Sequence, residues 1–143
     1  MQLIRRLTFS LFLLPALAHA GVSERAYDRA VDLIDRLYLY PDDLDASALL
    51  HGAARGLADE VPWLLVETQD NAVYLRHGSG ARVGGSVSVA SMATLPAALR
   101  SLEGLVVEAG YDLDGVEPRL EILKGTTRAL DRYSRVLAGE RLE

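Results

Sequence analysis

The stretch WLLVETQDNAVYLRH, residues 63–77, interrupts the helical pattern of the chain and decides its fold class. Its two flanks, residues 63–68 and 72–77, are rich in β-branched and aromatic side chains, and QDN between them offers a turn. After a glycine-rich connection, residues 86–90 (SVSVA) alternate polar and apolar side chains, as a third strand would. The stretch therefore predicts a small antiparallel sheet inserted between helices.

Two helical patterns precede this sheet. Apolar residues recur at three- and four-residue spacing over residues 26–38, where Ser23 can cap the start and Pro41 ends the pattern. A second pattern begins after Asp45, a favourable N-cap residue, and stops at Pro62. Two helices in tandem predict a helical hairpin.

The second helix carries two glycines four residues apart, Gly52 and Gly56. Because glycine inside a helix costs up to about 1 kcal/mol relative to alanine, we expect a close crossing with another helix to compensate. Residues 49–67 can also be laid over residues 122–140, which pairs Gly52 with Gly125. The match is a hint that both helices pack alike, with chance similarity between amphipathic helices as the alternative.

Two more helices follow the sheet. Thr94 opens the third helix and Gly110 stops it; after a turn at residues 112–115, Pro118 suits the first turn of the fourth. The apolar positions expected to continue this last helix are Leu120, Leu123, Thr127, Leu130 and Leu137. The predicted fold class is α+β and mainly α-helical: a helical hairpin, a small antiparallel β insert, then two further helices, in one module over residues 21–143.

Residues 1–20 have the composition of an export signal. Arg5 and Arg6 precede the mostly apolar residues 7–18, and Ala18-His19-Ala20 forms a cleavage site before Gly21. The apolar run is too short for a stable membrane anchor, and no cysteine follows the site to carry a lipid. We therefore expect a periplasmic or secreted protein. Loss of Arg5 and Arg6 would change its formal net charge from -5 to -7.

Composition excludes several classes of function. The chain has no cysteine, so it has no disulfide framework, thiolate nucleophile or zinc–thiolate site. Its acidic charge, with Lys124 as the only lysine among fifteen basic residues, argues against a nucleic-acid partner. The expected partner is another protein, with no cofactor, metal or small-molecule substrate.

Each stretch that resembles a ligand site has a plainer interpretation. The run HGSGARVGG, residues 77–85, lacks the G-K-[ST] ending of a phosphate loop and favours a hairpin connection. Asp112, Asp114 and Gly115 resemble the start of a calcium loop, but its later ligands are missing, so a turn is expected. A third group of acids precedes the second helix, where carboxylates favour the helix dipole: Asp42, Asp43 and Asp45.

Nucleophilic catalysis has few candidate residues. His51 and His77 are the histidines left after signal removal, and no serine has a G-x-S-x-G elbow. A serine–lysine pair would have to use Lys124, to which the sequence assigns no serine. A small hydrolase with an unrecognised site stays a third hypothesis for the function.

The end of the chain carries a family resemblance. LKGTTRALDRYSRVLAGE, residues 123–140, resembles the helix and following turn near the N-terminus of the C-terminal processing peptidases, or tail-specific proteases. The matching residues are Gly125, Leu130, Asp131, Tyr133, Ser134, Leu137 and Glu140. Arg132 stands where the family usually has proline. Upstream, LYLYPDDLD and LLHGAARGL are also similar to the family, so the resemblance extends from about Tyr27 to the end.

The resemblance implies a supporting role for the chain. In that family a PDZ domain and then a serine–lysine catalytic domain follow this region, and the three residues after Glu140 hold neither, so no catalytic residue can be carried over. What it implies is a non-catalytic N-terminal helical domain, a fragment or a remnant, that packs on a protease body or mediates dimerisation. The alternative is a free-standing periplasmic binding or adaptor protein. Aromatic side chains that either role could use, if they are not core, are Tyr27, Tyr38, Trp63 and Tyr133.

Overall fold

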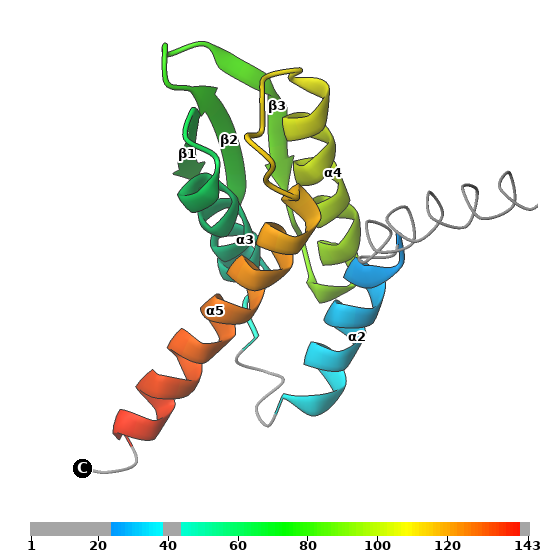
Figure 1. Cartoon of the computed structure of the whole chain (residues 1–143). Coiled ribbons are helices and arrows are strands. Elements are labelled where there is room, and N and C mark those ends of the chain that lie inside the picture. Colours follow the sequence, from blue (N-terminus) through cyan, green and yellow to red (C-terminus); the bar gives the residue numbers. More distant parts are fainter. Residues whose placement is uncertain (1–23, 39–43, 141–143) are drawn as a thin grey trace, which may run out of the picture.

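The computed structural model describes residues 24–38 and 44–140 of the chain (Figure 1). The elements are, in order, α2 (Ala26–Leu37), α3 (Ala46–Glu60), β1 (Leu64–Gln69), β2 (Ala72–His77), β3 (Arg82–Ser88), the 3-10 turn η2 (Met92–Thr94), α4 (Leu95–Glu108) and α5 (Pro118–Glu140). Two helices, a three-stranded antiparallel sheet and two further helices confirm the predicted α+β class. The export signal, the Ser23 cap and the Pro41 stop lie outside the described residues.

The helix ends follow local sequence chemistry. Asp45 caps α3, where its carboxylate accepts hydrogen bonds from the backbone N–H groups of Ser47 and Ala48 at 3.0 and 3.4 Å. The N-cap position of α2 is occupied by Arg25, whose side chain makes no capping bond. Gly110 follows α4 with a φ of 75°, the left-handed conformation that lets a chain leave a helix. The predicted stops of α3 and α4 are confirmed.

The sheet has the order β1–β2–β3, with antiparallel pairing throughout. β3 begins at Arg82, earlier than the strand expected at residue 86, so that boundary was wrong. Tyr74 pairs with Ser86 while the next residue of β2, Leu75, pairs with Val83, which leaves two glycines in a bulge. Glycine has a low propensity for strands, so residues 84 and 85 did not suggest one. Gly84 nevertheless has a φ of 65°, a left-handed conformation that permits the bulge.

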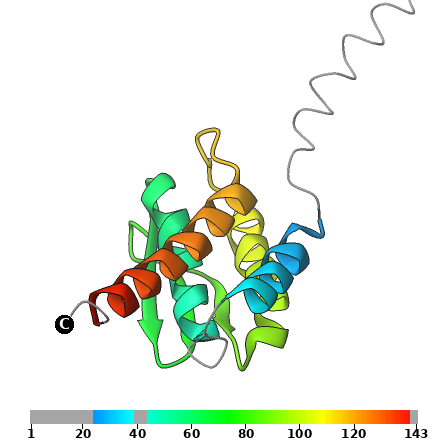
Figure 2. The ribbon, with the colours of Figure 1, turned by 90° about the horizontal axis from the view of Figure 1, so that it is seen from below.

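The elements form two layers. α3 and α4 cover one face of the sheet, α5 packs across α3, and α2 packs chiefly on α4, so the first two helices find their main helical partners in the second half of the chain. Figure 2 shows α5 lying across α3, with α2 to one side. The fully buried large side chains lie between these layers: Tyr27, Leu49, Leu50, Leu57, Val61, Val73, Leu75, Leu95, Leu99, Leu102, Val106 and Ile122.

Candidate functional site

The crossing of α3 and α5 is a contact at backbone distance, and it contains Gly125, the first residue of the motif that carries the resemblance. A Cβ atom added to Gly52 would lie 2.6 Å from Ala129 Cβ and 2.9 Å from Gly125 O. One added to Gly56 would lie 2.6 Å from Gly125 Cα. Real Cβ contacts are never this short, so the two helices approach at backbone distance, and the expected close crossing is confirmed.

The crossing is reciprocal. A Cβ on Gly125 would lie 2.3 Å from Gly52 O and 3.0 Å from the Cα atoms of Ala53 and Gly56. Gly52 lies near Ala129 and Gly56 near Glu121, so the helices run antiparallel. The two glycines that the internal comparison pairs are therefore in contact with each other, which agrees with the hint that the two helices pack alike.

The buried face of α5 differs from the expected one. Gly125 must face α3, so Ile122 and Thr126 turn inward and are buried. Leu120 and Thr127, expected on the apolar face, are exposed, and that part of the prediction was wrong. The spacing of the leucines predicted the wrong buried face, because α5 contacts α3 through glycine, the smallest residue, and not through a large apolar side chain.

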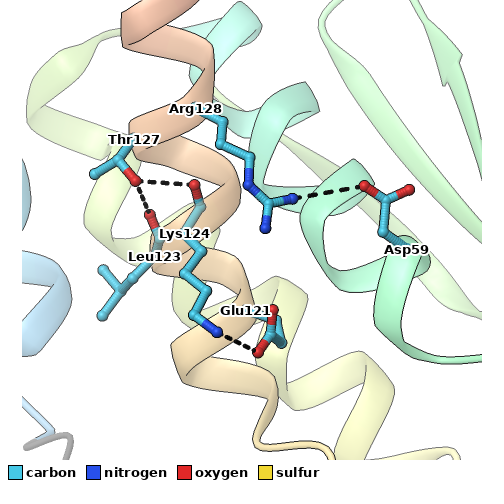
Figure 3. A network of polar contacts seen from close by, with 6 residues as sticks. All are labelled: Asp59, Glu121, Leu123, Lys124, Thr127 and Arg128. Carbon is cyan, nitrogen blue, oxygen red and sulfur yellow. Dashed lines mark hydrogen bonds and ion pairs between the residues drawn. The ribbon is translucent and has the colours of Figure 1, made fainter.

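Polar contacts flank the crossing (Figure 3). Lys124 Nζ lies 3.1 Å from Glu121 Oε1, and Glu121 is buried in the first turns of α5. Thr127 Oγ1 donates to the backbone oxygen of Lys124 at 2.9 Å, within α5 itself. Arg128 reaches Asp59 of α3 at 3.7 Å, but both side chains are exposed and such pairs contribute little. Lys124, the lysine of any serine–lysine pair, is thus engaged with a carboxylate.

The remaining motif residues lie further along α5. Leu130 is half-buried against the core. The backbone is helical through Asp131–Glu140, but the side chains of these residues lie outside the part that the structure describes. The turn that the resemblance implies after Leu130 is not formed, because the helix continues to Glu140. Arg132 keeps the backbone N–H that a proline would lack, which allows this continuation.

A second cluster joins three helices and was not predicted from the sequence. Tyr27 of α2 is fully buried, and its hydroxyl donates to Glu103 Oε2 of α4 at 2.8 Å. Arg119 of α5 binds the same carboxylate with two nitrogens, Nη2 to Oε1 at 3.0 Å and Nε to Oε2 at 3.1 Å. Its guanidinium also lies 5.8 Å from the centre of the Tyr27 ring. Each residue of the cluster lies on a different helix, so no residue spacing within one segment could have predicted the cluster.

The electrostatics of this cluster favour one protonation state. Burial raises the pKa of Tyr27, and the hydrogen bond and negative charge of Glu103 raise it further. The hydrogen bonds from Arg119 to Glu103 also raise the pKa of the guanidinium. Tyr27 therefore stays a neutral donor, and the ion pair satisfies Glu103. We infer a structural role, since a phenolate nucleophile is disfavoured here.

A groove of about 520 Å³ lies beside this cluster, between α2 and α4. Glu103 and Arg119 line it, and an ion pair between Arg100 and Asp28 bridges the two helices. Its lining also carries further charges of both signs, Glu24, Glu108 and Arg25.

The two histidines lie apart in different settings. His77 ends β2 in a ring cluster, with its centroid 5.5 Å from that of Trp63 and 4.3 Å from that of Tyr111. Its Nδ1 atom lies 2.9 Å from Ser79 Oγ in the hairpin turn. His51 is half-buried on α3, and its Nε2 atom has no hydrogen-bond partner among the described residues. Among the residues that the structure describes, neither histidine is paired with both a nucleophile and an acid.

His51 should make stability depend on pH. Burial lowers its pKa, and Arg55 lowers it further while Asp45 opposes the change. As the pH falls through about 6.5, the unfolded state binds this proton before the folded state does, so the free energy of unfolding falls. Urea titrations should show a larger loss for the wild type than for His51→Gln between about pH 7.5 and about pH 5.5. Parallel losses in the two proteins would contradict this.

The candidate cation ligands that lie among the described residues have structural roles. Asp45 caps α3, whereas Asp42 and Asp43 lie outside the described residues. Asp112 accepts a hydrogen bond from the N–H of Asp114 at 2.9 Å, which forms the expected turn. Within residues 24–38 and 44–140, no three acids or histidines gather as a metal site would require. Residues 77–85 form the hairpin connection and the first part of β3.

Comparison with known proteins returned no match: no family model, curated protein or solved structure is detectably similar to this chain. None of the helices in the described ranges has the length and apolar character needed to cross a membrane.

Proposed function

We propose that this chain is a non-catalytic protein-contact module, similar to the N-terminal helical domain of an exported tail-specific protease. Helix α5 would make the contact. The observation that carries this proposal is the way α5 is held. Gly125 is pressed against the backbone of α3, and the helix then runs on to Glu140. Its last turns extend beyond α3 in Figure 1. Because α5 is held at one end, its last turns would present a surface to a partner in a fixed orientation.

The sequence of the extended part suits such a contact. Tyr133 and Leu137 are four residues apart, and a helix places residues at this spacing on one side. An apolar stripe of this kind fits a groove or a second helix on a partner protein. The partner would be a protease body or a second copy of the chain.

A free-standing periplasmic binding or adaptor protein is the second candidate. It is favoured by the single core, to which α2, α3, α4, α5 and all three strands contribute buried side chains. Such a closed core suits a domain that folds and works alone.

The mass of the protein in its own cells separates these candidates. An antibody against residues 21–143 would isolate the native species for intact mass measurement. A species several times heavier than the 15.5 kDa chain would support the protease module. A species slightly lighter than 15.5 kDa would support signal removal and a free-standing protein.

Leu137→Asp should abolish self-association while leaving the fold intact. Helix α5 continues to Glu140, and its last turns extend beyond α3 in Figure 1, so a charge at residue 137 should disrupt the proposed contact surface. Light scattering should show a dimer for the wild type at high concentration and a monomer for the variant, with melting temperatures within about 2 °C. Leu33→Asp, on the exposed side of α2, is the control and should stay dimeric. A monomeric wild type, or a dimer that persists in Leu137→Asp, would contradict self-association through α5.

A further inference from the structure

His77 ends β2 and is bonded through its side chain to the turn that leads to β3. The backbone N–H of Ser79 donates to His77 Nδ1 at 3.1 Å, and Ser79 Oγ lies 2.9 Å from the same nitrogen. A ring nitrogen that accepts an N–H carries no hydrogen of its own, so the neutral imidazole has its proton on Nε2. The Ser79 hydroxyl then also donates to Nδ1. The turn thus selects one tautomer of His77.

Two aromatic rings hold this imidazole in place. The planes of the Trp63 and His77 rings are 21° apart in a stacked arrangement, and the centroid of the Tyr111 ring lies 4.3 Å from that of His77. Trp63 is itself fixed, because its Nε1 atom donates to the backbone oxygen of Asp112 at 2.8 Å. The faces of aromatic rings attract cations at such distances. We therefore expect the imidazole to keep its position when it becomes charged.

The other hydrogen bonds of the turn do not involve the imidazole. His77 N donates to Ala81 O and Gly80 N donates to His77 O, both at 2.8 Å, and Gly78 N donates to Trp63 O at 2.7 Å. These bonds join backbone groups, which do not titrate. A change of protonation at Nδ1 therefore acts directly on Ser79 and leaves the hairpin closed.

The charged and titratable groups around His77 come from each segment packed near it. They are Glu67 of β1, Arg76 of β2, Arg82 of β3, and Tyr111 and Asp112 after α4. The three groups on the strands lie on the opposite face of the sheet from His77, because successive side chains of a strand alternate and paired residues share a face. The Asp112 carboxylate accepts a hydrogen bond within its own turn. Among the described residues, the groups bonded to Nδ1 are therefore the first to respond when His77 is protonated.

We propose that His77 is a pH-sensitive switch on the β2–β3 turn, which releases the backbone N–H of Ser79 when the protein is acidified. A proton from solvent binds Nδ1, which changes from an acceptor into a donor. The Ser79 hydroxyl can accept this new hydrogen, because a hydroxyl oxygen both donates and accepts. The backbone N–H can only donate, so it loses its partner and turns to solvent. This switch involves no residue of α5 and is independent of the function proposed above.

Nuclear magnetic resonance of the ¹⁵N-labelled protein tests the switch directly. At about pH 8 the imidazole ¹⁵N shifts should place the ring proton on Nε2. As the pH falls to about 5, the range in which histidine gains its charge, the Ser79 amide proton should move upfield because its hydrogen bond is lost. This movement should have the same midpoint as the titration of the His77 ring. A ring proton on Nδ1 at about pH 8, or a Ser79 amide that does not follow the ring, would overturn the proposal.

Fluorescence gives a second measurement, because Trp63 is the only tryptophan of the chain. A charged imidazole quenches an indole stacked on it, so the emission of the wild type should fall as the pH decreases from about 8 to about 5. His77→Gln should lose this change, whereas the matched control His51→Gln, on α3, should keep it. If His77→Gln fails to fold, as judged by circular dichroism, the resonance titration of the wild type still decides. Equal changes in folded His77→Gln and in the wild type would count against the switch.

Discussion

Replacing Gly125 with alanine should lower the free energy of unfolding by about 2–3 kcal/mol, although alanine is the better helix former. The new Cβ atom would lie 2.3 Å from Gly52 O and 3.0 Å from the Cα atoms of Ala53 and Gly56. All of these are backbone atoms of α3, which cannot rotate away, so the two helices must separate. Urea unfolding followed by circular dichroism would measure the change.

Gly104→Ala is the matched control for this prediction. Gly104 lies inside α4, and a Cβ atom there would meet nothing within 4 Å. The same substitution should therefore raise the free energy of unfolding by up to about 1 kcal/mol through helix propensity alone. If Gly125→Ala were also neutral or stabilising, the tight crossing of α3 and α5 would not be a feature of the folded protein.

Glu103→Ala should lower the free energy of unfolding by about 2–4 kcal/mol, because one deletion removes hydrogen bonds from two side chains that are largely shielded from water. The Tyr27 hydroxyl would lose its acceptor, and the Arg119 guanidinium would lose both hydrogen bonds to the carboxylate. The side chains of Glu103 and Arg119 are only 19 % and 23 % exposed, so water cannot fully replace the lost contacts. α2, which this cluster joins to α4 and α5, should loosen first in hydrogen exchange.

Asp32→Ala provides the control for Glu103→Ala. Asp32 also binds an arginine, Arg36, at 2.9 Å, but the two side chains are 54 % and 73 % exposed. The loss should stay below about 0.5 kcal/mol, as for other solvent-exposed pairs one helical turn apart. Equal losses from the two substitutions would show that burial of the Tyr27 cluster does not matter to stability.

Much of α3 could be predicted from the sequence because its signals are local. Asp45 at the start, Pro62 after the end and an apolar face at helical spacing each depend on neighbours within a few residues. Even the contact of α3 with another helix could be expected from the sequence, because Gly52 and Gly56 are unfavourable in an isolated helix. The antiparallel sheet was recognised for the same reason.

The features that escaped prediction depend on residues far apart in the sequence. Tyr27, Glu103 and Arg119 meet only when three helices pack, and nothing around any one of them signals the other two. The buried face of α5 is set by Gly125 against α3, so counting leucines placed Leu120 inside when it is exposed. Both cases show long-range packing overriding a local pattern.

The crossing of α3 and α5 also has a consequence for the order of folding. The sheet and α4 lie between these helices in the sequence, so forming the contact closes a loop that contains both. Loop closure of this kind carries an entropic cost before the contact can stabilise anything, and such contacts form slowly. We expect the sheet and α4 to assemble first and α5 to dock last. A nascent chain would thus complete its core only after α5 has been synthesised.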